Sequence, residues 1–225
     1  MRQKQVFIGL ITEGPTDIRF LSGIINRSVQ EIACECETEI EVPDVQPLRS
    51  QGMTFVEKML NASQLACEKY GMSILFIHAD SDNKKLDDVM NTKFIPLQNA
   101  LSTKDENSYC KHIVPTIPIQ MIESWMMADK QLLKQLINAE SLHNATLGLE
   151  RMPESYADPK FVIENAIRKS LSNMPKKKRN QIRISDLYEI LGNRLDLNSL
   201  RQLPSFKQFE DNILQSFREL HLIRG

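Results

Sequence analysis

Two apolar segments of this chain each lead directly into a short acidic turn. Residues 6–12 lead into the turn 13–17, whose sequence is EGPTD, and residues 73–77 lead into 78–82, whose sequence is HADSD. Continuous apolar runs of this length, bounded by turn residues, predict strands buried on both faces of a parallel sheet. Open parallel sheets bind ligands at the carboxyl ends of their strands. We therefore expect four carboxylates to meet at one sheet edge: Glu13, Asp17, Asp80 and Asp82.

Carboxylates gathered at one edge repel one another unless a cation neutralises them. Their hard oxygen atoms suit Mg²⁺ or Mn²⁺. Asp80 and Asp82 alternate in a segment that we expect to be extended, so both side chains should project to the same side. This spacing predicts that both are metal ligands.

Glu13 and Asp17 each have a structural interpretation beside the functional one. Gly14 and Pro15 form a tight turn that would hold the Glu13 side chain over the sheet edge, although a lone glutamate here is more often solvent-facing. Asp17 falls in the first turn of the next helix, where a carboxylate stabilises the helix dipole whether or not it binds a metal ion.

Strand and helix patterns alternate along the first half of the chain, which predicts an α/β fold. A helix follows the first acidic turn, and Pro96 should interrupt the later helix over 86–101. From residue 119 the pattern is almost wholly helical. We expect an α/β core over 1–130 and a helical C-terminal section over 131–225. The further expected strands are 38–48, 73–79 and 112–118, and the further helices are 53–69, 119–128, 130–138, 159–172, 183–193 and 206–222.

Composition favours a soluble cytoplasmic protein. The chain has 225 residues and four cysteines without a C-x-x-C pair, so we expect reduced thiols rather than disulfides. The apolar stretch near the N-terminus stops at Glu13, too early for a signal peptide. No run approaches the roughly 20 apolar residues that a membrane span needs.

Charge is distributed unevenly along the chain. Residues 1–167 hold 16 Lys and Arg against 23 Asp and Glu, whereas residues 168–225 hold 12 against 6. An acidic body with a C-terminal section that is net basic from 168 predicts that contact with a polyanion uses the C-terminal part. Its densest cluster is Lys176, Lys177, Lys178 and Arg179, which could bind phosphate groups or form a solvated loop between two helices.

Glu123 lies inside an otherwise apolar helical segment that carries the single tryptophan. A carboxylate on such a face must be paired, protonated or bound to a metal ion. Asp129, by contrast, precedes the apolar pattern of the next helix and is well placed to cap it. We therefore favour a functional role for Glu123 and a capping role for Asp129.

These residues resemble a known family. An E-G-x-T-D turn after one strand, followed by Asp80-Ser81-Asp82 after a later strand, resembles the Toprim domain of topoisomerases, primases and the overcoming-lysogenisation-defect nucleases. Residues 122–129 (IESWMMAD) and 197–206 (LNSLRQLPSF) resemble the small Toprim-like family of uncharacterised bacterial proteins often placed beside an ATPase partner.

The resemblance implies a Toprim-like (Rossmann-like) α/β core with a mostly parallel sheet and flanking helices. It implies that Glu13 is a general acid/base or metal ligand and that Asp80 and Asp82 bind metal. Asp17 would help to hold the metal ion, and a further acid would come from downstream, for which Glu123 is our candidate. Those enzymes also have a lysine near the site, and no residue of this sequence matches it.

The predicted function is a nuclease that uses Mg²⁺ or Mn²⁺ to hydrolyse DNA or RNA, as a homodimer in a phage-defence system with a separate ATPase subunit. The chain lacks the motif G-x-x-x-x-G-K-S/T, so ATP hydrolysis would need another chain. One alternative is a non-catalytic Toprim-like partner or sensor subunit that binds nucleotide or nucleic acid. Another is nucleotidyl transfer, as in primases.

Overall fold

The computed structural model describes residues 4–36, 39–82, 85–172 and 182–223. Within these residues the main sheet has four parallel strands, and the register brings the carboxyl ends of three of them to the same edge. Two further short strands pair with each other in parallel. The expected α/β class with a parallel, Rossmann-like sheet is confirmed. The main sheet has the order β4 (Gln46–Pro47), β2 (Ile8–Ile11), β5 (Ile74–His78) and β6 (His112–Thr116), and the separate pair is β1 (Lys4–Gln5) with β3 (Ile40–Glu41).

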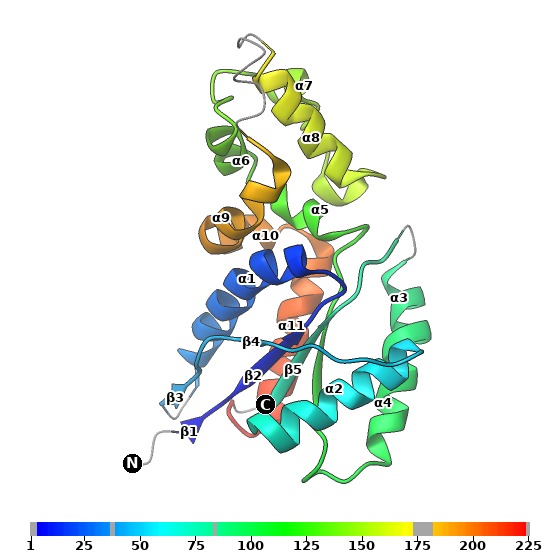
Figure 1. Cartoon of the computed structure of the whole chain (residues 1–225). Coiled ribbons are helices and arrows are strands. Elements are labelled where there is room, and N and C mark those ends of the chain that lie inside the picture. The colour runs from blue at the N-terminus through cyan, green and yellow to red at the C-terminus, as the bar shows by residue number, and fades with distance from the viewer. Residues whose placement is uncertain (1–3, 37–38, 83–84, 173–181, 224–225) are drawn as a thin grey trace.

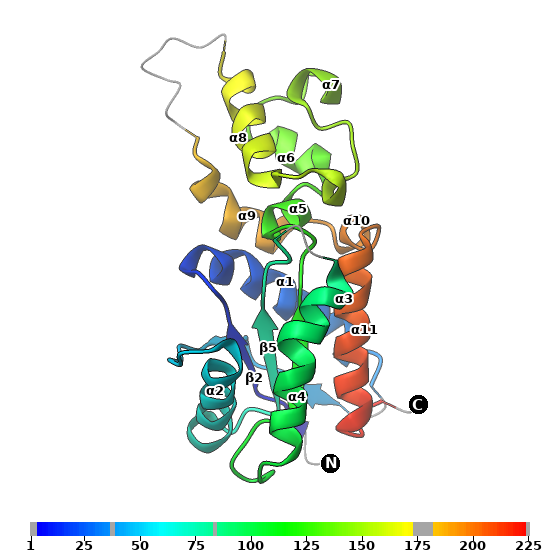
Figure 2. The same cartoon turned by 90° about the vertical axis from the view of Figure 1, so that its right-hand side faces the viewer.

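Helices cover both faces of the sheet (Figures 1 and 2). Successive strand residues point to opposite faces, so Phe76 joins one apolar core and Leu75 the other. All residues of β2 and β5 are buried, which explains their continuous apolar sequences. The helices on Phe76's side are α1 (Pro15–Ala33) and α11 (Pro204–Glu219), and those on Leu75's side are α2 (Phe55–Tyr70) and α4 (Ile95–Ser102).

The strand expected over 38–48 is instead two short strands. β3 pairs with β1, whereas β4 pairs with β2 at the edge of the main sheet. Pro43 lies between β3 and β4, and a proline cannot donate a hydrogen bond to a strand ladder. Pro47 is tolerated because β4 is an edge strand.

The helical segment before α4 contains a widened turn. It consists of α3 (Leu86–Val89) and a π-helical turn, η1 (Met90–Phe94), and the N–H of Ile95 donates to the carbonyl of Met90. Pro96 follows directly, and a proline ring disrupts the regular α-helical ladder. The expected interruption near Pro96 is confirmed, and it takes the form of a π turn.

The chain is helical after β6, and each helix expected there has a counterpart. In Figure 2, α6, α7 and α8 lie beyond the carboxyl end of the sheet. The chain then returns to the core, because α9 packs against α1 and α11 packs against β6. The domain division at residue 130 stays a prediction. The helices are α5 (Ile122–Met126), α6 (Lys130–Leu136), α7 (Asn144–Leu147), α8 (Pro159–Ser170), α9 (Leu187–Arg194) and α10 (Leu197–Leu200), with the 3₁₀ turns η2 (Pro153–Ser155) and η4 (Ile184–Asp186).

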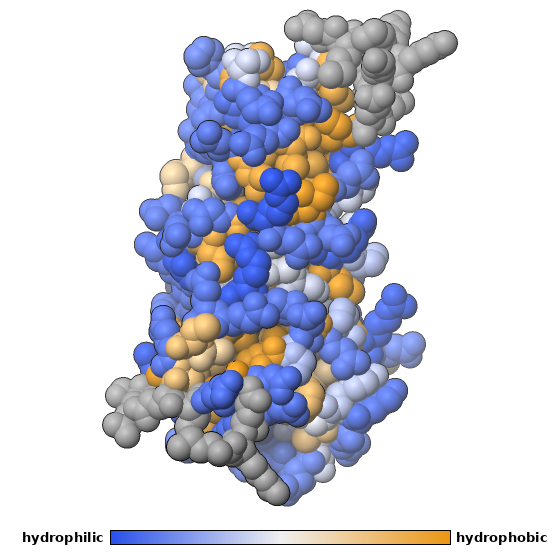
Figure 3. Space-filling model, turned by 90° about the vertical axis from the view of Figure 1, so that its left-hand side faces the viewer, coloured by the Kyte–Doolittle hydropathy of each residue, from blue (hydrophilic) through white to orange (hydrophobic). Residues whose placement is uncertain are grey.

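Hydrophilic residues cover most of the face seen in Figure 3, with apolar residues visible between them. A hollow of about 490 Å³ lies between α8 and the residues that lead into α9, and Ile167, Leu171, Ile182 and Ile184 are its apolar lining. In the part of the chain that the structure describes, no helix combines the length and the apolar character needed to cross a membrane.

Candidate functional site

The carboxyl ends of β2 and β5 form the topological switch point of the sheet, where the chain connections leave in opposite directions. From β2 the chain passes through α1 to β4 on one side, and from β4 it passes through α2 to β5 on the other. The two connecting helices cover opposite faces. In open α/β sheets the crevice at such a point binds ligands. The turn 13–17 follows β2 and the turn 79–82 follows β5, so both acidic turns lie at this point.

A buried histidine connects the two acidic turns. His78 is the last residue of β5, and its side chain is 0% exposed. Its Nε2 lies 3.1 Å from Asp80 Oδ1, and its Nδ1 lies 3.6 Å from Asp17 Oδ2. The second distance is too long for a hydrogen bond, and Nδ1 is a buried atom that has no hydrogen-bond partner among the described residues. His78 was not among the predicted site residues, although a histidine that ends an apolar strand before two aspartates is a signal for one.

Asp17 stabilises the start of α1 and also faces the buried histidine, while its binding of a metal ion stays a prediction. Its Oδ2 accepts a hydrogen bond of 2.9 Å from the N–H of Gly14 at the start of α1. This is the expected stabilisation of a helix N-terminus. The same oxygen faces His78, so the carboxylate also belongs to the acidic site.

Glu13 is a solvent-exposed residue of the turn after β2, and it pairs with a lysine from another segment. Its side chain is 50% exposed, and its Oε1 lies 3.3 Å from Nζ of Lys93 in η1. The Lys93 ammonium also lies 5.5 Å from the centre of the Phe55 ring, a cation–π contact that restricts its position. The Toprim resemblance implied a lysine near the site, and no residue of the sequence could be assigned to it. In the structure Lys93 lies beside Glu13.

Asp80 and Asp82 do not alternate along an extended segment. β5 ends at His78, and Asp82 adopts a left-handed conformation with φ 47°. The N–H of Asp82 donates to the carbonyl of Gln120, and the hydroxyl of the buried Ser81 accepts from the N–H of Gln120 at 2.7 Å. These bonds turn the chain, so Asp80 is partly buried and Asp82 is exposed. The prediction that both side chains project from an extended stretch is wrong.

Glu123 is a buried carboxyl group, only 5% exposed, that approaches the acidic turns from α5. It accepts a hydrogen bond of 2.5 Å from the hydroxyl of Tyr188 in α9. Burial raises the pKa of Glu123 above its ordinary value, the Tyr188 hydrogen bond and the charge of Lys160 lower it, and the charge of Asp80 raises it. Burial and Glu123 raise the pKa of Tyr188, as does the charge of Asp17. Glu123 is therefore paired, and it lies close enough to the acidic turns to interact with their charges.

Replacing Tyr188 by phenylalanine should lower the free energy of unfolding by about 1–3 kcal/mol, because a buried carboxyl oxygen loses its donor. Urea unfolding measures this change. Tyr70→Phe is the matched control, because in the described residues the Tyr70 hydroxyl forms no hydrogen bond, and its expected change is within about 0.5 kcal/mol. Equal losses in both variants would contradict the pairing of Glu123 with Tyr188.

Two other sequence predictions have different outcomes. The carboxylate of Asp129 accepts from the N–H groups of Gln131 and Leu132 at the start of α6, which confirms its role as a helix cap. The basic cluster 176–179 lies outside the described residues. Its contact with phosphate groups stays a prediction.

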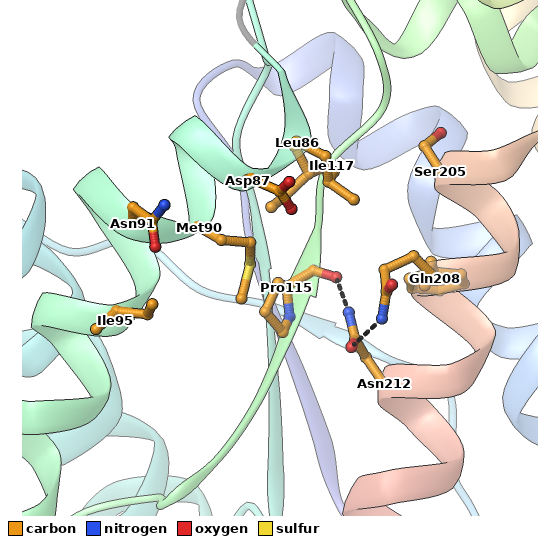
Figure 4. A pocket seen from close by; sticks show the side chains of 11 residues that line it. Leu86, Asp87, Met90, Asn91, Ile95, Pro115, Ile117, Ser205, Gln208 and Asn212 are labelled. Atoms are coloured by element: carbon orange, nitrogen blue, oxygen red, sulfur yellow. Dashed lines mark hydrogen bonds between the residues drawn. The ribbon is translucent and has the colours of Figure 1, made fainter.

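A separate groove lies at the edge of the sheet beside β6 (Figure 4). It has a volume of about 430 Å³ and lies between α3–η1–α4 and α11. Gln208 donates to Asn212, which donates to the carbonyl of Pro115, so the exposed edge of β6 is partly satisfied by side chains. None of the acidic residues of the site lines this groove, which is therefore distinct from the switch point.

A family model described as a domain of unknown function, DUF4276, matches residues 12–214. The chain belongs to the DUF4276 family. No curated protein and no solved structure matches it. The match begins directly after β2 and finishes within α11, so it covers both acidic turns, the strands β4, β5 and β6, and the helices beyond the sheet.

The donor atoms at the switch point of this DUF4276 domain suit a hydrated hard cation. Among the residues that the structure describes, no three His, Cys, Asp or Glu side chains are close enough to enclose a metal ion. Mg²⁺, however, keeps several waters and often binds through one or two carboxylates. Asp80 offers such a carboxylate, and the buried His78 orients it. The oxygen donors therefore fit Mg²⁺ or Mn²⁺ better than a metal ion that needs a closed protein cage.

Proposed function

We propose that this chain is a nuclease that uses Mg²⁺ or Mn²⁺ to hydrolyse phosphodiester bonds of DNA or RNA. The observation that carries the proposal is the buried His78, which faces Asp17 and Asp80 at the topological switch point. Carboxylates collected around a buried, partly unsatisfied group are typical of functional sites, because such an arrangement costs stability. The resemblance of both acidic turns to Toprim domains supports the same reaction.

Each residue then has a defined part in hydrolysis. Asp80 would hold the hydrated metal ion through its carboxylate, and Asp17, Asp82 and Glu123 would add negative charge on the same side of the sheet. His78 holds Asp80 in position. When bound, the metal ion lowers the pKa of a coordinated water and neutralises charge on the phosphate group.

Glu13 and Lys93 act on the outer side of the site. Hydrolysis joins a water oxygen to phosphorus and breaks one P–O ester bond, and Glu13 accepts the proton that the water loses. Lys93, 3.3 Å from Glu13, provides positive charge for the phosphate oxygens in the transition state. The freed ester oxygen takes its proton from solvent.

The direct test is a nuclease assay on labelled single- and double-stranded DNA and RNA, with Mg²⁺, with Mn²⁺ and with EDTA. We expect cleavage that EDTA abolishes. The assay is repeated with the product of any neighbouring ATPase gene, because the proposal includes a separate ATPase subunit, a homodimer and a role in phage defence in the cytoplasm. Absence of cleavage in every combination would contradict the nuclease assignment.

A non-catalytic partner or sensor subunit that binds nucleotide or nucleic acid is the second candidate. It is favoured by one observation: Oδ2 of Asp17 already accepts a hydrogen bond from the Gly14 N–H, and the described part of the chain has no three-ligand cluster. Binding of nucleic acid without cleavage, with or without metal ions, would favour this candidate.

Replacing Asp80 and Asp82 together by asparagine should abolish Mn²⁺ binding measured by titration calorimetry. Asparagine keeps the shape of both side chains and tolerates the left-handed conformation at position 82. We expect Asp80→Asn alone to have the larger effect, because Asp80 is oriented by His78 whereas Asp82 is exposed. Unchanged affinity in the double variant would remove both residues from the proposed site.

Replacing Lys176, Lys177, Lys178 and Arg179 by serine should weaken nucleic-acid binding without changing Mn²⁺ affinity. The slope of the logarithm of the binding constant against the logarithm of the salt concentration should become shallower by about 0.7–0.9 for each phosphate contact that is lost. The control replaces the three lysines by arginine, which keeps the charge. If the serine variant retains the parental slope in anisotropy titrations, the cluster is a solvated connection.

A further inference from the structure

A hollow of about 550 Å³ opens beside Glu13, between the end of β2 and the chain that follows β4. It therefore adjoins the carboxyl edge of the sheet on the side away from Asp80. Its size is in the range of ordinary ligand sites. Its polar lining is Thr12, Glu13, Arg49, Ser50, Gln51 and Lys58.

Two cations in this lining have no side-chain partner among the residues that the structure describes. Among the described residues, neither Arg49 nor Lys58 forms an ion pair or a side-chain hydrogen bond. Arg201, by contrast, is paired with Glu31 and Glu210. The lining of the hollow holds these two cations against one acidic residue, Glu13, although residues 1–167 as a whole hold 23 acidic against 16 basic side chains.

The backbone beneath these cations is held in place. Leu48 is buried, and its N–H donates to the carbonyl of Leu10 at 2.7 Å. Ser50 donates its hydroxyl to the carbonyl of Lys58 at 2.9 Å, and Asn61 donates its side-chain N–H to the carbonyl of Gln51 at 2.9 Å. Arg49 and Lys58 therefore project from fixed positions, and an anion that binds them need not order the loop first.

We propose that this hollow binds backbone phosphate groups of a nucleic-acid strand next to the bond that is cut. Arg49 and Lys58 supply the charge, and the side-chain amide of Gln51 supplies a neutral hydrogen-bond donor. The inference rests on the proposed nuclease function, and it adds a substrate requirement. The strand must extend beyond the scissile phosphodiester, across the end of β2 and toward β4.

This placement separates two kinds of substrate. An oligonucleotide has phosphate groups on both sides of the cut bond and can occupy the hollow while another phosphate lies at the acidic site. A single phosphodiester such as bis(p-nitrophenyl) phosphate has no further phosphate for the hollow. Arg49 and Lys58 should therefore affect the first substrate and not the second.

Binding is tested with the full chain carrying Arg49→Gln and Lys58→Gln, in EDTA, so that no cleavage occurs. Anisotropy titration with a fluorescent single-stranded oligonucleotide should give a Kd about 10-fold weaker than for the parent, and a salt slope smaller by about 1.4 for two lost contacts. The matched control is Lys69→Gln with Lys104→Gln. Both are exposed lysines near the amino end of the sheet, so the charge change is the same and binding should not change.

Catalysis is tested with the same variants in Mn²⁺. For the oligonucleotide we expect KM to rise about 10-fold at unchanged kcat, because the lost contacts bind the substrate and its transition state equally. Turnover of bis(p-nitrophenyl) phosphate should stay at the parental rate. Circular dichroism and urea unfolding confirm that both variants are folded.

The outcomes separate this inference from the nuclease proposal. If the oligonucleotide binds through Arg49 and Lys58 but is never cut, the phosphate subsite stands and the nuclease assignment fails. If it is cut with parental KM and parental salt slope in the double variant, the subsite is wrong and the nuclease assignment stands. If the parent binds neither the oligonucleotide nor inorganic pyrophosphate in calorimetry, the subsite is also wrong.

Discussion

Replacing Glu13 by glutamine is expected to lower kcat for oligonucleotide hydrolysis by about 10²–10⁴-fold, the usual contribution of a general acid or base. Glutamine has nearly the same shape but cannot accept a proton from the attacking water. It also ends the ion pair with Lys93, 3.3 Å away. Because the Glu13 side chain is 50% exposed, losing that ion pair should change the free energy of unfolding by less than about 1 kcal/mol.

Glu106→Gln is the matched control for this prediction. Glu106 is an exposed glutamate in the loop that leads into β6, at the opposite end of the sheet from Glu13. It should leave kcat unchanged. Rates are measured in single turnover with Mn²⁺, and urea unfolding shows that each variant is folded. A folded Glu13→Gln protein with the parental kcat would remove Glu13 from the chemical step.

The sheet and the position of the acidic turns were predictable because their signals are local. Residues 8–11 and 74–77 are apolar without interruption, and each segment is followed within a few residues by a turn that carries carboxylates. Parallel pairing brings such turns to one edge whatever the rest of the chain does. The cap at Asp129 was predictable for the same reason, because it depends on its own helix.

The partners of the site residues could not be predicted, because they come from distant segments. Lys93 reaches Glu13 across 80 positions of sequence, and Tyr188 reaches Glu123 across 65. Neither partner lies in a motif. His78 is different, since it is adjacent to the second acidic turn and its burial followed from the strand pattern.

Local conformation was mispredicted where the chain makes contacts with another loop. The alternation of Asp80 and Asp82 suggested an extended stretch, but hydrogen bonds to Gln120 from the loop after β6 turn the chain at Asp82. The short helices α7 and α10 have four residues each, too few for a periodic signal in the sequence.

Replacing Gly192 by alanine is expected to lower the free energy of unfolding by about 1–3 kcal/mol, the usual cost of overpacking. In this size range each kcal/mol lowers Tm by about 2–4 °C, so calorimetry should detect the change. Gly192 lies where α9 crosses α1, and a Cβ added there would meet the carbonyl oxygen of Phe20 at 2.3 Å. On the other helix, a Cβ added at Gly23 would meet the backbone of Gly192 at 2.6 Å. Both contacts are with backbone atoms, so the helices must move apart.

Moving α9 away from α1 should also disturb the acidic site, because α9 carries Tyr188, the hydrogen-bond donor to the buried Glu123. Gly192→Ala and Tyr188→Phe should therefore be non-additive, with a coupling of at least about 0.5 kcal/mol in a double-mutant cycle of urea unfolding. Glu189→Ala, an exposed change on the same helix, is the control and should cost less than about 0.5 kcal/mol. Strict additivity would mean that the contact between α1 and α9 and the hydrogen bond that holds Glu123 are independent. Coupling would mean that the C-terminal helices help to position the buried Glu123 carboxyl group, whose pKa the charge of Asp80 raises.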